Sequence, residues 1–350
     1  MSQKNFKRFY LENILDFLWR QWSALGVAGG AYAQDLWAID PEALLVFSLP
    51  IARYEPRLFD EIIDWLVINA KWIDIQRLRA IIRNKDEKTK RLLSAAAHMV
   101  SNEAKTYSRK WRAIAELYKY NSDSKAEILF KTKEGKSHPE PRETSLIYSD
   151  YGFLRGKFIL RRLSKKVPIN TGCNIRFLLR GLFGIGSRAE CILFLLRYDA
   201  GHPSEVAEAI GLSVRGTQDT LIELAESGLV LTRIKGKRKI EYWLSKKRWW
   251  EFLTGMKYED IKKPVWLNWI SIFSGLRDVW DVLCEIEKPN SDYMKSSKLR
   301  QAMEEIRCKF LIRGIVTAVP PDIHTPVNKY EKEFQSFIKK VLGAKDGTDK

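Results

Sequence analysis

Cysteine and histidine are both scarce in this sequence, with four of each among 350 residues. The cysteines form no C-x-x-C pair and have no histidine at metal-ligand spacing; they are Cys173, Cys191, Cys284 and Cys308. This excludes the usual zinc patterns, and we expect neither a metal nor another cofactor. A disulfide framework is not expected in a chain of this length, which favours the reducing cytoplasm.

Long apolar runs are absent as well. No stretch reaches ~18 uninterrupted apolar residues, the length at which a membrane span is predicted. The first turns are charged, which does not fit a secretory signal peptide; the charged residues are Lys4, Lys7, Arg8, Glu12 and Asp16. We therefore expect a cytoplasmic protein that does not enter a membrane.

Enzyme motifs are the third absence. The glycine-rich run GLFGIGS, residues 181–187, lacks the Lys-Ser/Thr ending of a P-loop. Gly186-Ser187 followed by Asp199 is similar to the start of a nucleotidyltransferase motif, but position 201 is Gly, where a second Mg²⁺-binding carboxylate is needed. Neither H-E-x-x-H nor G-x-S-x-G occurs. The sequence predicts that the protein is not an enzyme, and an enzyme without a recognisable motif stays open as an alternative.

Positive charge is abundant and unevenly distributed. The chain has 60 Lys/Arg and 43 Asp/Glu, a formal net charge of +17. Residues 151–250 hold 19 Lys/Arg and 8 Asp/Glu, so well over half of the net charge falls on under a third of the chain. Such a basic region favours an anionic partner, either nucleic acid or a membrane surface.

The basic region contains a run of helix and turn signals. Ser187 and Glu190 have the spacing of a capping box at the start of an apolar helix. A second, short helix is predicted to begin at Pro203 and to end at Gly211. Because glycine tolerates positive φ, Gly211 suits a sharp turn between two helices.

A third helix and a hairpin complete this region. Ser213 is predicted to cap the third helix, which ends at Gly228. Two strand-like runs, 229–234 and 239–244, then flank a basic turn. The predicted order is therefore two helices, a sharp turn, a third helix and a two-stranded hairpin.

The run PSEVAEAIGLSVRGTQDTLIELAESGLVLTRIKGKRKIEYWLS, residues 203–245, resembles the winged helix-turn-helix of bacterial and archaeal transcriptional regulators, broadly MarR- or ArsR-like. With the preceding helix the resemblance spans residues 187–245, and it consists of small, apolar and glycine positions. It implies a central winged helix-turn-helix with a two-stranded β wing. The helical spacing of apolar residues on both sides predicts a mainly α protein in which helical N- and C-terminal domains flank this module.

The resemblance also implies a mode of DNA recognition, because the third helix of such modules enters the major groove. Its first residues would read base edges; they are Ser213, Val214, Arg215, Thr217 and Gln218. Arg215 suits guanine and Gln218 suits adenine. The wing cations would straddle a phosphate backbone or enter a minor groove; they are Lys235, Lys237, Arg238 and Lys239. Arg188 and Ser204 would hold flanking phosphates. Gly216 departs from good helix-forming sequence at this point.

The flanks suggest a second hypothesis. The segment IDPEALLVFSLPIARYEPRLFDEIIDWL, residues 39–66, and the Trp-rich C-terminal part resemble proteins of bacterial mobile, defence or toxin–antitoxin loci. Our first hypothesis is a sequence-specific regulator that binds double-stranded DNA, acts at its own promoter and forms a homodimer. The alternative is an antitoxin-like or defence-complex subunit that binds a protein partner encoded nearby, with DNA binding secondary.

Turn signals and charge predict five segments: a helical N-terminal domain at 1–120, a linker or exposed insertion at 121–150, a basic approach segment with the winged helix at 151–253, a helical C-terminal domain at 260–342, and a flexible tail at 343–350. The first segment includes a long helix over 88–118. Asp40-Pro41 is typical of a helix start, with Asp40 as the cap and Pro41 in the first turn. The helices at 41–52, 56–70 and 75–83 suggest a second helix-turn-helix whose arginines point outward, or else a plain solvated basic face; the arginines are Arg77, Arg79 and Arg83.

Overall fold

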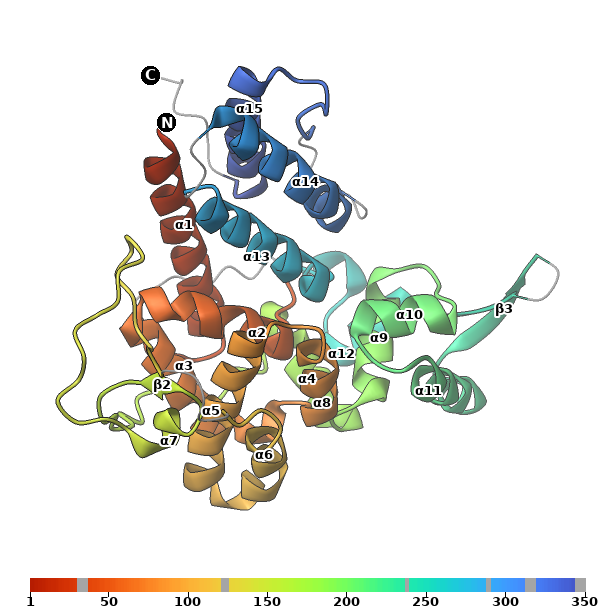
Figure 1. Cartoon of the computed structure of the whole chain (residues 1–350). Helices are drawn as coiled ribbons and strands as arrows, with labels where there is room; N and C mark the ends of the chain where they lie inside the picture. The colour runs from red at the N-terminus through yellow and green to blue at the C-terminus, as the bar shows by residue number, and fades with distance from the viewer. Residues whose placement is uncertain (30–36, 121–125, 237–238, 288–290, 312–318, 344–350) are drawn as a thin grey trace. The chain divides into compact units, whose positions relative to one another are not determined.

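The computed structural model describes residues 1–29, 37–120, 126–236, 239–287, 291–311 and 319–343 (Figure 1). It confirms a mainly helical protein with a small two-stranded antiparallel sheet. The chain divides into two compact units. We call residues 1–17 with 269–350 the terminal unit, and residues 18–268 the central unit.

The terminal unit contains the first part of α1 (Gln3–Ala24) and three further helices: α13 (Trp269–Glu285), α14 (Asp292–Leu311) and α15 (Val327–Val341). Aromatic contacts join α1 to α13. Tyr10 stacks on Trp280 with ring centroids 6.5 Å apart, and its hydroxyl donates to the Leu276 carbonyl over 2.6 Å. Burial raises the pKa of Tyr10 well above its usual value, so this phenol stays protonated and keeps donating.

The central unit opens with a helical layer made of α2 (Pro41–Ile51), α3 (Pro56–Asn69), α4 (Ile75–Ile82), α5 (Glu87–Glu103) and α6 (Ser108–Ala115). Asp40 caps α2 by accepting the Ala43 N–H over 3.0 Å, and Pro41 occupies the first turn, as the sequence predicts. The helix expected over 88–118 is interrupted: α5 ends before Ala104, whose backbone leaves the helical region (φ −93°, ψ 71°).

The segment after this layer is packed against it. Within 121–150, where a linker or exposed insertion is predicted, the described residues begin at 126 and include β1 (Glu127–Ile128) and α7 (Leu146–Ser149); β1 pairs in parallel with β2 (Phe153–Leu154). The buried Arg155 forms an ion pair of 2.9 Å with Asp60 of α3. Four aromatic rings surround its guanidinium at centroid distances of 4.7 to 5.9 Å: Phe59, Phe130, Tyr148 and Phe158. These contacts anchor the segment to α3.

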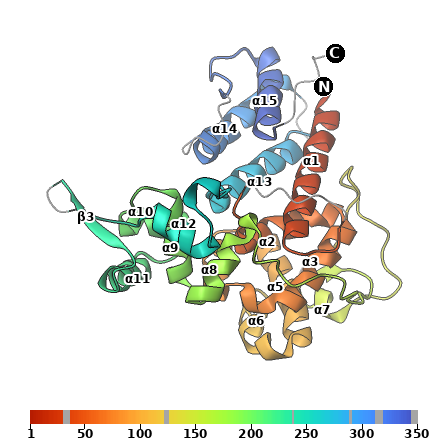
Figure 2. The ribbon, with the colours of Figure 1, turned by 180° about the vertical axis from the view of Figure 1, so that it is seen from behind.

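The second half of the central unit contains α8 (Ile175–Phe183), α9 (Ser187–Arg197), α10 (Pro203–Ile210), α11 (Val214–Glu226), β3 (Leu231–Lys235), β4 (Lys239–Trp243) and α12 (Lys246–Thr254). We call residues 187–254 the helix–hairpin module. Gly211 ends α10 in the left-handed region (φ 73°), as the sequence predicts, and the chain turns directly into α11. In both views the β3–β4 hairpin extends beyond α10 and α11 (Figure 1, Figure 2).

One apolar core supports this module. Its buried side chains come from α9, α10, α11 and β4 and include Ile192, Val206, Leu221, Leu224 and Tyr242. The loop before α10 also joins the sheet, because Gly201 and Tyr242 exchange two backbone hydrogen bonds of 2.9 Å. The hairpin is therefore fixed at its base both by packing and by backbone pairing.

One sequence prediction near this core, the capping box of Ser187 and Glu190, is wrong. Ser187 is the first residue of α9 and does not cap it; its hydroxyl instead lies 2.6 Å from the Thr220 hydroxyl. Glu190 is buried against arginines, so the predicted capping box does not form. A capping box occurs at α10, where His202 accepts the Ser204 N–H and Glu205 accepts the His202 N–H.

Candidate nucleic-acid interface

Four of the five predicted base-reading residues are exposed at the start of α11. Val214 is 50% exposed, and Arg215 and Gln218 are exposed beside it. Ser213 is exposed too, and its hydroxyl accepts the Gly216 N–H over 3.3 Å, which makes it the helix cap. The first turn thus offers a guanidinium, a carboxamide and an aliphatic group on one exposed surface.

Thr217 does not lie at the exposed surface of α11, where the sequence prediction places it. Its side chain is fully buried, one turn before the buried Leu221 on the same face of α11. Because residues four apart share a helix face, Thr217 belongs to the core and does not reach a base edge. The spacing of 217, 221 and 224 in the sequence contains the signal that identifies this position as core.

The later turns of α11 expose three acidic side chains together with Ile222. Asp219, Glu223 and Glu226 are exposed in its later turns. Arg188 of α9, predicted to contact the DNA backbone, forms an ion pair of 2.7 Å with Glu223. An approaching polyanion is therefore favoured at the first turn of α11 and disfavoured at its last turn.

The hairpin carries a strong positive charge organised around one carboxylate. Residues 231–243 contain five Lys/Arg and one Glu in the sequence. The buried Glu241 lies 2.9 Å from Lys235 and 2.9 Å from Arg233, whose side chains are mostly exposed. The hydrogen bonds from Lys235 and Arg233 lower the pKa of Glu241, so it stays ionised and orients both cations.

The remaining predicted contacts lie around α10. Lys239 forms an ion pair of 2.7 Å with Glu205, and the hydrogen bond that Lys239 donates to Glu205 raises the pKa of Lys239. Ser204 is exposed, with its hydroxyl 2.9 Å from His202 Nδ1. Lys237 and Arg238 lie outside the described residues.

Sequence reasoning missed some exposed cations in the same module. Arg233 shares a strand face with Lys235, which the two-residue period of a strand was sufficient to indicate. Lys247 and Arg248 are exposed in the first turn of α12, directly after the hairpin. These three residues extend the basic surface beyond the predicted set.

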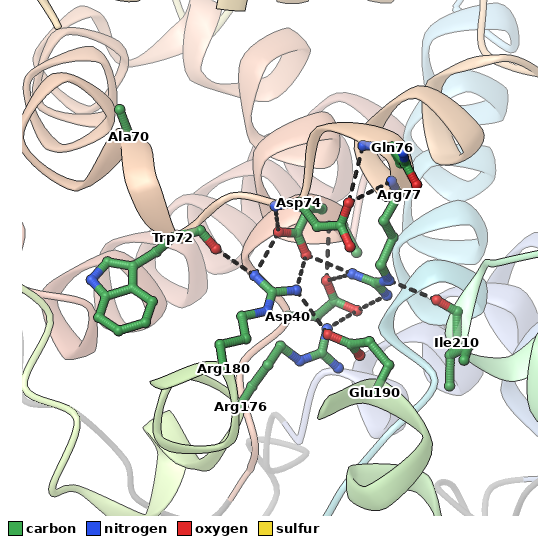
Figure 3. A network of polar contacts seen from close by, with 12 residues as sticks. Asp40, Ala70, Trp72, Asp74, Gln76, Arg77, Arg176, Arg180, Glu190 and Ile210 are labelled. Carbon is green, nitrogen blue, oxygen red and sulfur yellow. Dashed lines mark hydrogen bonds and ion pairs between the residues drawn. The ribbon is translucent and has the colours of Figure 1, made fainter. Parts of the chain in front are cut away.

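A buried network of ion pairs, which the sequence patterns do not predict, joins the helix–hairpin module to the helices that precede it (Figure 3). It joins residues of α2, α4, α8 and α9 and the residues just before α2 and α4; its members are Asp40, Glu42, Asp74, Arg77, Arg176, Arg180 and Glu190. Arg77, expected to point outward in a second helix-turn-helix, is buried here, whereas Arg79 and Arg83 are exposed. That expectation is therefore wrong for Arg77, whose charge is satisfied inside the unit.

Arg77 connects this network to the helix–hairpin module. Its Nη1 donates to Asp40 over 2.6 Å and to Glu42 over 2.7 Å, and its Nε donates to the Ile210 carbonyl over 2.6 Å. Ile210 is the last residue of α10, and Gly211 follows it. The network therefore holds the point at which the chain turns into α11.

Two arginines of α8 complete the network. Arg180 forms ion pairs of 2.7 Å with Glu42 and 2.8 Å with Glu190. Arg176 lies 2.9 Å from Asp40 and 3.4 Å from Glu190. Each of these three carboxylates thus has two arginine partners, which offsets the cost of removing the charges from water.

The surroundings shift the pKa values of two network carboxyls, Asp40 and Asp74, in opposite directions. Burial by itself raises the pKa of Asp40, but Arg176 and Arg77 outweigh it and hold that pKa well below its usual range. Asp74 differs, because burial and then the nearby Glu42 raise its pKa. Asp40 is therefore a fixed anion, and Asp74 is the network carboxyl that takes up a proton more readily than usual.

Other kinds of site are not evident in the described part of the chain. No group of three or more His, Cys, Asp or Glu side chains gathers there as a metal ion would require. Within the same residues, no helix combines the length and apolar character needed to cross a bilayer. Comparison with protein-family models, curated proteins and solved structures finds no match to this chain.

Proposed function

We propose that the helix–hairpin module is a winged helix-turn-helix that binds double-stranded DNA, and that the protein is a sequence-specific transcriptional regulator. The order α9, α10, left-handed Gly211, α11 and β3–β4 supports this, as does the Gly201–Tyr242 pairing at the base of the wing. The observation that carries the proposal is the exposed first turn of α11 beside a hairpin with five Lys/Arg and one Glu.

The proposed mechanism places the first turn of α11 in the major groove. Arg215 would donate to O6 and N7 of guanine, and Gln218 would pair with adenine. The cations of β3 and β4 would contact phosphates and supply affinity without sequence preference. The acidic later turns of α11 would stay away from the backbone, which limits base reading to the entry of the helix.

We further propose that the protein acts in the cytoplasm as a homodimer at its own promoter. Two copies related by a two-fold axis would read two half-sites, and half-site spacing near one helical turn, ~34 Å, would follow from that symmetry.

The test compares two variants that differ only in which arginine they lack. Arg215→Ala should reduce affinity for the preferred duplex by about tenfold to a hundredfold, equivalent to about 1–3 kcal/mol, and should relax preference at one base position. Arg79→Ala removes an exposed arginine of α4 outside the module and should leave binding unchanged. Equal loss from both variants, on every sequence, would contradict base reading by Arg215.

A second candidate function is binding of a protein partner encoded nearby. The observation that favours it is Phe252 of α12, which is 66% exposed beside Trp249 at a centroid distance of 6.1 Å. Exposed aromatic residues of this kind are typical of protein interfaces. Phe252→Ser should then abolish a complex with the neighbouring gene product on co-expression while leaving DNA affinity unchanged.

A further inference from the structure

The hairpin has an apolar pair in the middle of its positive charge. Ile234 and Ile240 lie directly opposite each other in the antiparallel β3–β4 ladder and are 76% and 47% exposed. Directly opposite residues share one face of a two-stranded ribbon. The two side chains therefore form a single apolar surface next to the Gly236 turn.

The faces of the hairpin differ in chemistry. Arg233, Lys235 and Lys239 share one face with the buried Glu241, which pairs with the first two. The other face carries the isoleucine pair, and nearer the base of the hairpin it is buried at Tyr242. The apolar pair thus begins where the packed core ends, one ladder step beyond the Thr232–Tyr242 pair on the same face. The hairpin that carries it extends beyond α10 and α11 (Figure 2).

We propose that Ile234 and Ile240 form an apolar wedge that enters the minor groove of duplex DNA, separates two stacked base pairs and bends the duplex. This inference rests on the proposed DNA-binding function and adds to it a deformation of the target. Apolar side chains on a cationic arm are the chemistry by which proteins unstack base steps from the minor groove. The ligand class is therefore a duplex with a flexible pyrimidine–purine step, TA or CA/TG.

Charge and size favour DNA over the other partners for an exposed apolar pair. Five Lys/Arg against one Glu in residues 231–243 favour a polyanion. A membrane surface is anionic too, but stable attachment needs a much larger apolar face than two side chains. The exposed first turn of α11, with Arg215 and Gln218, belongs to the same module and carries side chains that can pair with base edges of a duplex.

The matched test uses isoleucine substitutions that preserve β-branching. Thr has the strand preference of Ile but a polar hydroxyl in its side chain, whereas Val has both the strand preference and an apolar side chain. A duplex of about 30 bp from the protein's own upstream region, with a central TA step, is titrated to saturation with full-length wild type, with Ile234→Thr/Ile240→Thr and with Ile234→Val/Ile240→Val. Affinity is read by anisotropy, and bending by energy transfer between dyes on the two ends.

We expect wild type and the Val variant to raise energy transfer, and the Thr variant to bind within about tenfold of wild type without raising it. Replacing the TA step by a stiffer GC step should reduce bending by wild type. Bending by the Thr variant equal to wild type would overturn the wedge while leaving DNA binding intact, as would binding by wild type without bending. Failure of wild type to bind any duplex would overturn both proposals. Binding of wild type but not the Thr variant to phosphatidylserine vesicles, in place of DNA, would assign the pair to a lipid surface instead.

Discussion

Removal of Arg180 should destabilise the central unit far more than removal of an exposed ion-paired arginine. Asp40, Glu42 and Glu190 each pair with two of Arg77, Arg176 and Arg180, and all six are buried. Arg180→Met removes one positive charge from this interior and leaves Glu42 and Glu190 with one arginine partner each. It also deprives the Trp72 carbonyl of a donor at 2.6 Å. Breaking a buried ion pair from one side costs about 3–5 kcal/mol.

The expected magnitude lies toward the lower end of that range. Glu42 keeps Arg77 at 2.7 Å, and Glu190 keeps Arg176 at 3.4 Å. We therefore expect a loss of about 3 kcal/mol in the free energy of unfolding, more than a hundredfold in the folding equilibrium. Such a loss is a large part of the stability of a typical domain, about 5–15 kcal/mol.

The assay is urea unfolding of the full chain followed by tryptophan fluorescence and circular dichroism. Arg188→Met is the matched control, because Arg188 forms a 2.7 Å pair with Glu223 in which both side chains are about half exposed. Exposed pairs contribute about 0–1 kcal/mol, so this variant should unfold close to wild type. Equal midpoints for the two variants would refute the conclusion that the network holds the unit together.

Three further predictions concern separate parts of the central unit. The pKa of Asp40 is lower in the folded than in the unfolded state, so the ionised carboxylate stabilises the fold fully above the unfolded pKa near ~4, and this contribution is lost as pH falls below that value. The free energy of unfolding measured from pH 7 to pH 2 should show this loss. Asp40→Asn should flatten the pH dependence. Gly216→Ala should raise the free energy of unfolding by up to about 1 kcal/mol, and the close approach of the new Cβ to Ser213 Oγ, 3.1 Å, should reduce this gain. The same variant should weaken duplex binding. Unchanged affinity in anisotropy would show that DNA does not approach this turn closely. Arg155→Met should cost about 1–3 kcal/mol because Asp60 loses its 2.9 Å partner, and limited trypsin digestion should then cut the 126–150 segment faster than in wild type.

Local signals in the sequence were sufficient for the helix ends that depend on one or two neighbouring residues. Asp40 with Pro41, Gly211 and Ser213 act where the sequence predicts, because capping and left-handed turns are decided within a few residues. The interruption at Ala104 follows no glycine or proline, so nothing in the local sequence indicates it.

The buried network was beyond local reasoning because its partners are far apart in the chain. Arg77 and Ile210 are 133 positions apart, and Arg180 and Glu42 are 138 apart. An arginine on a short helix predicts a solvated face unless its partners are known, and these partners come from other elements. The misassigned capping box at Glu190 has the same origin, since its carboxylate pairs with Arg180 of α8.

Part of the candidate interface was predictable. The exposed Arg215 and Gln218 follow from the start of α11, which is a local feature. The pairing of Lys239 with Glu205 and of Arg188 with Glu223 depends on how α9, α10, α11 and the hairpin pack together. The carboxylates in those pairs partly neutralise the basic side chains of the module. The count of basic residues in the sequence therefore overstates the positive charge that an anionic partner meets at Arg188.

Sequence-specific DNA binding is decided by the affinity of the purified protein for its own upstream duplex and for a scrambled duplex, measured across a salt series. A sequence-specific regulator should prefer the upstream duplex at every salt concentration. Replacing the hairpin cations Lys235, Lys237, Arg238 and Lys239 by Gln should lower the slope of log affinity against log salt by about 0.9 for each lost phosphate contact. Weak and equal binding to both duplexes, with a slope that the Gln variant does not change, would contradict the account.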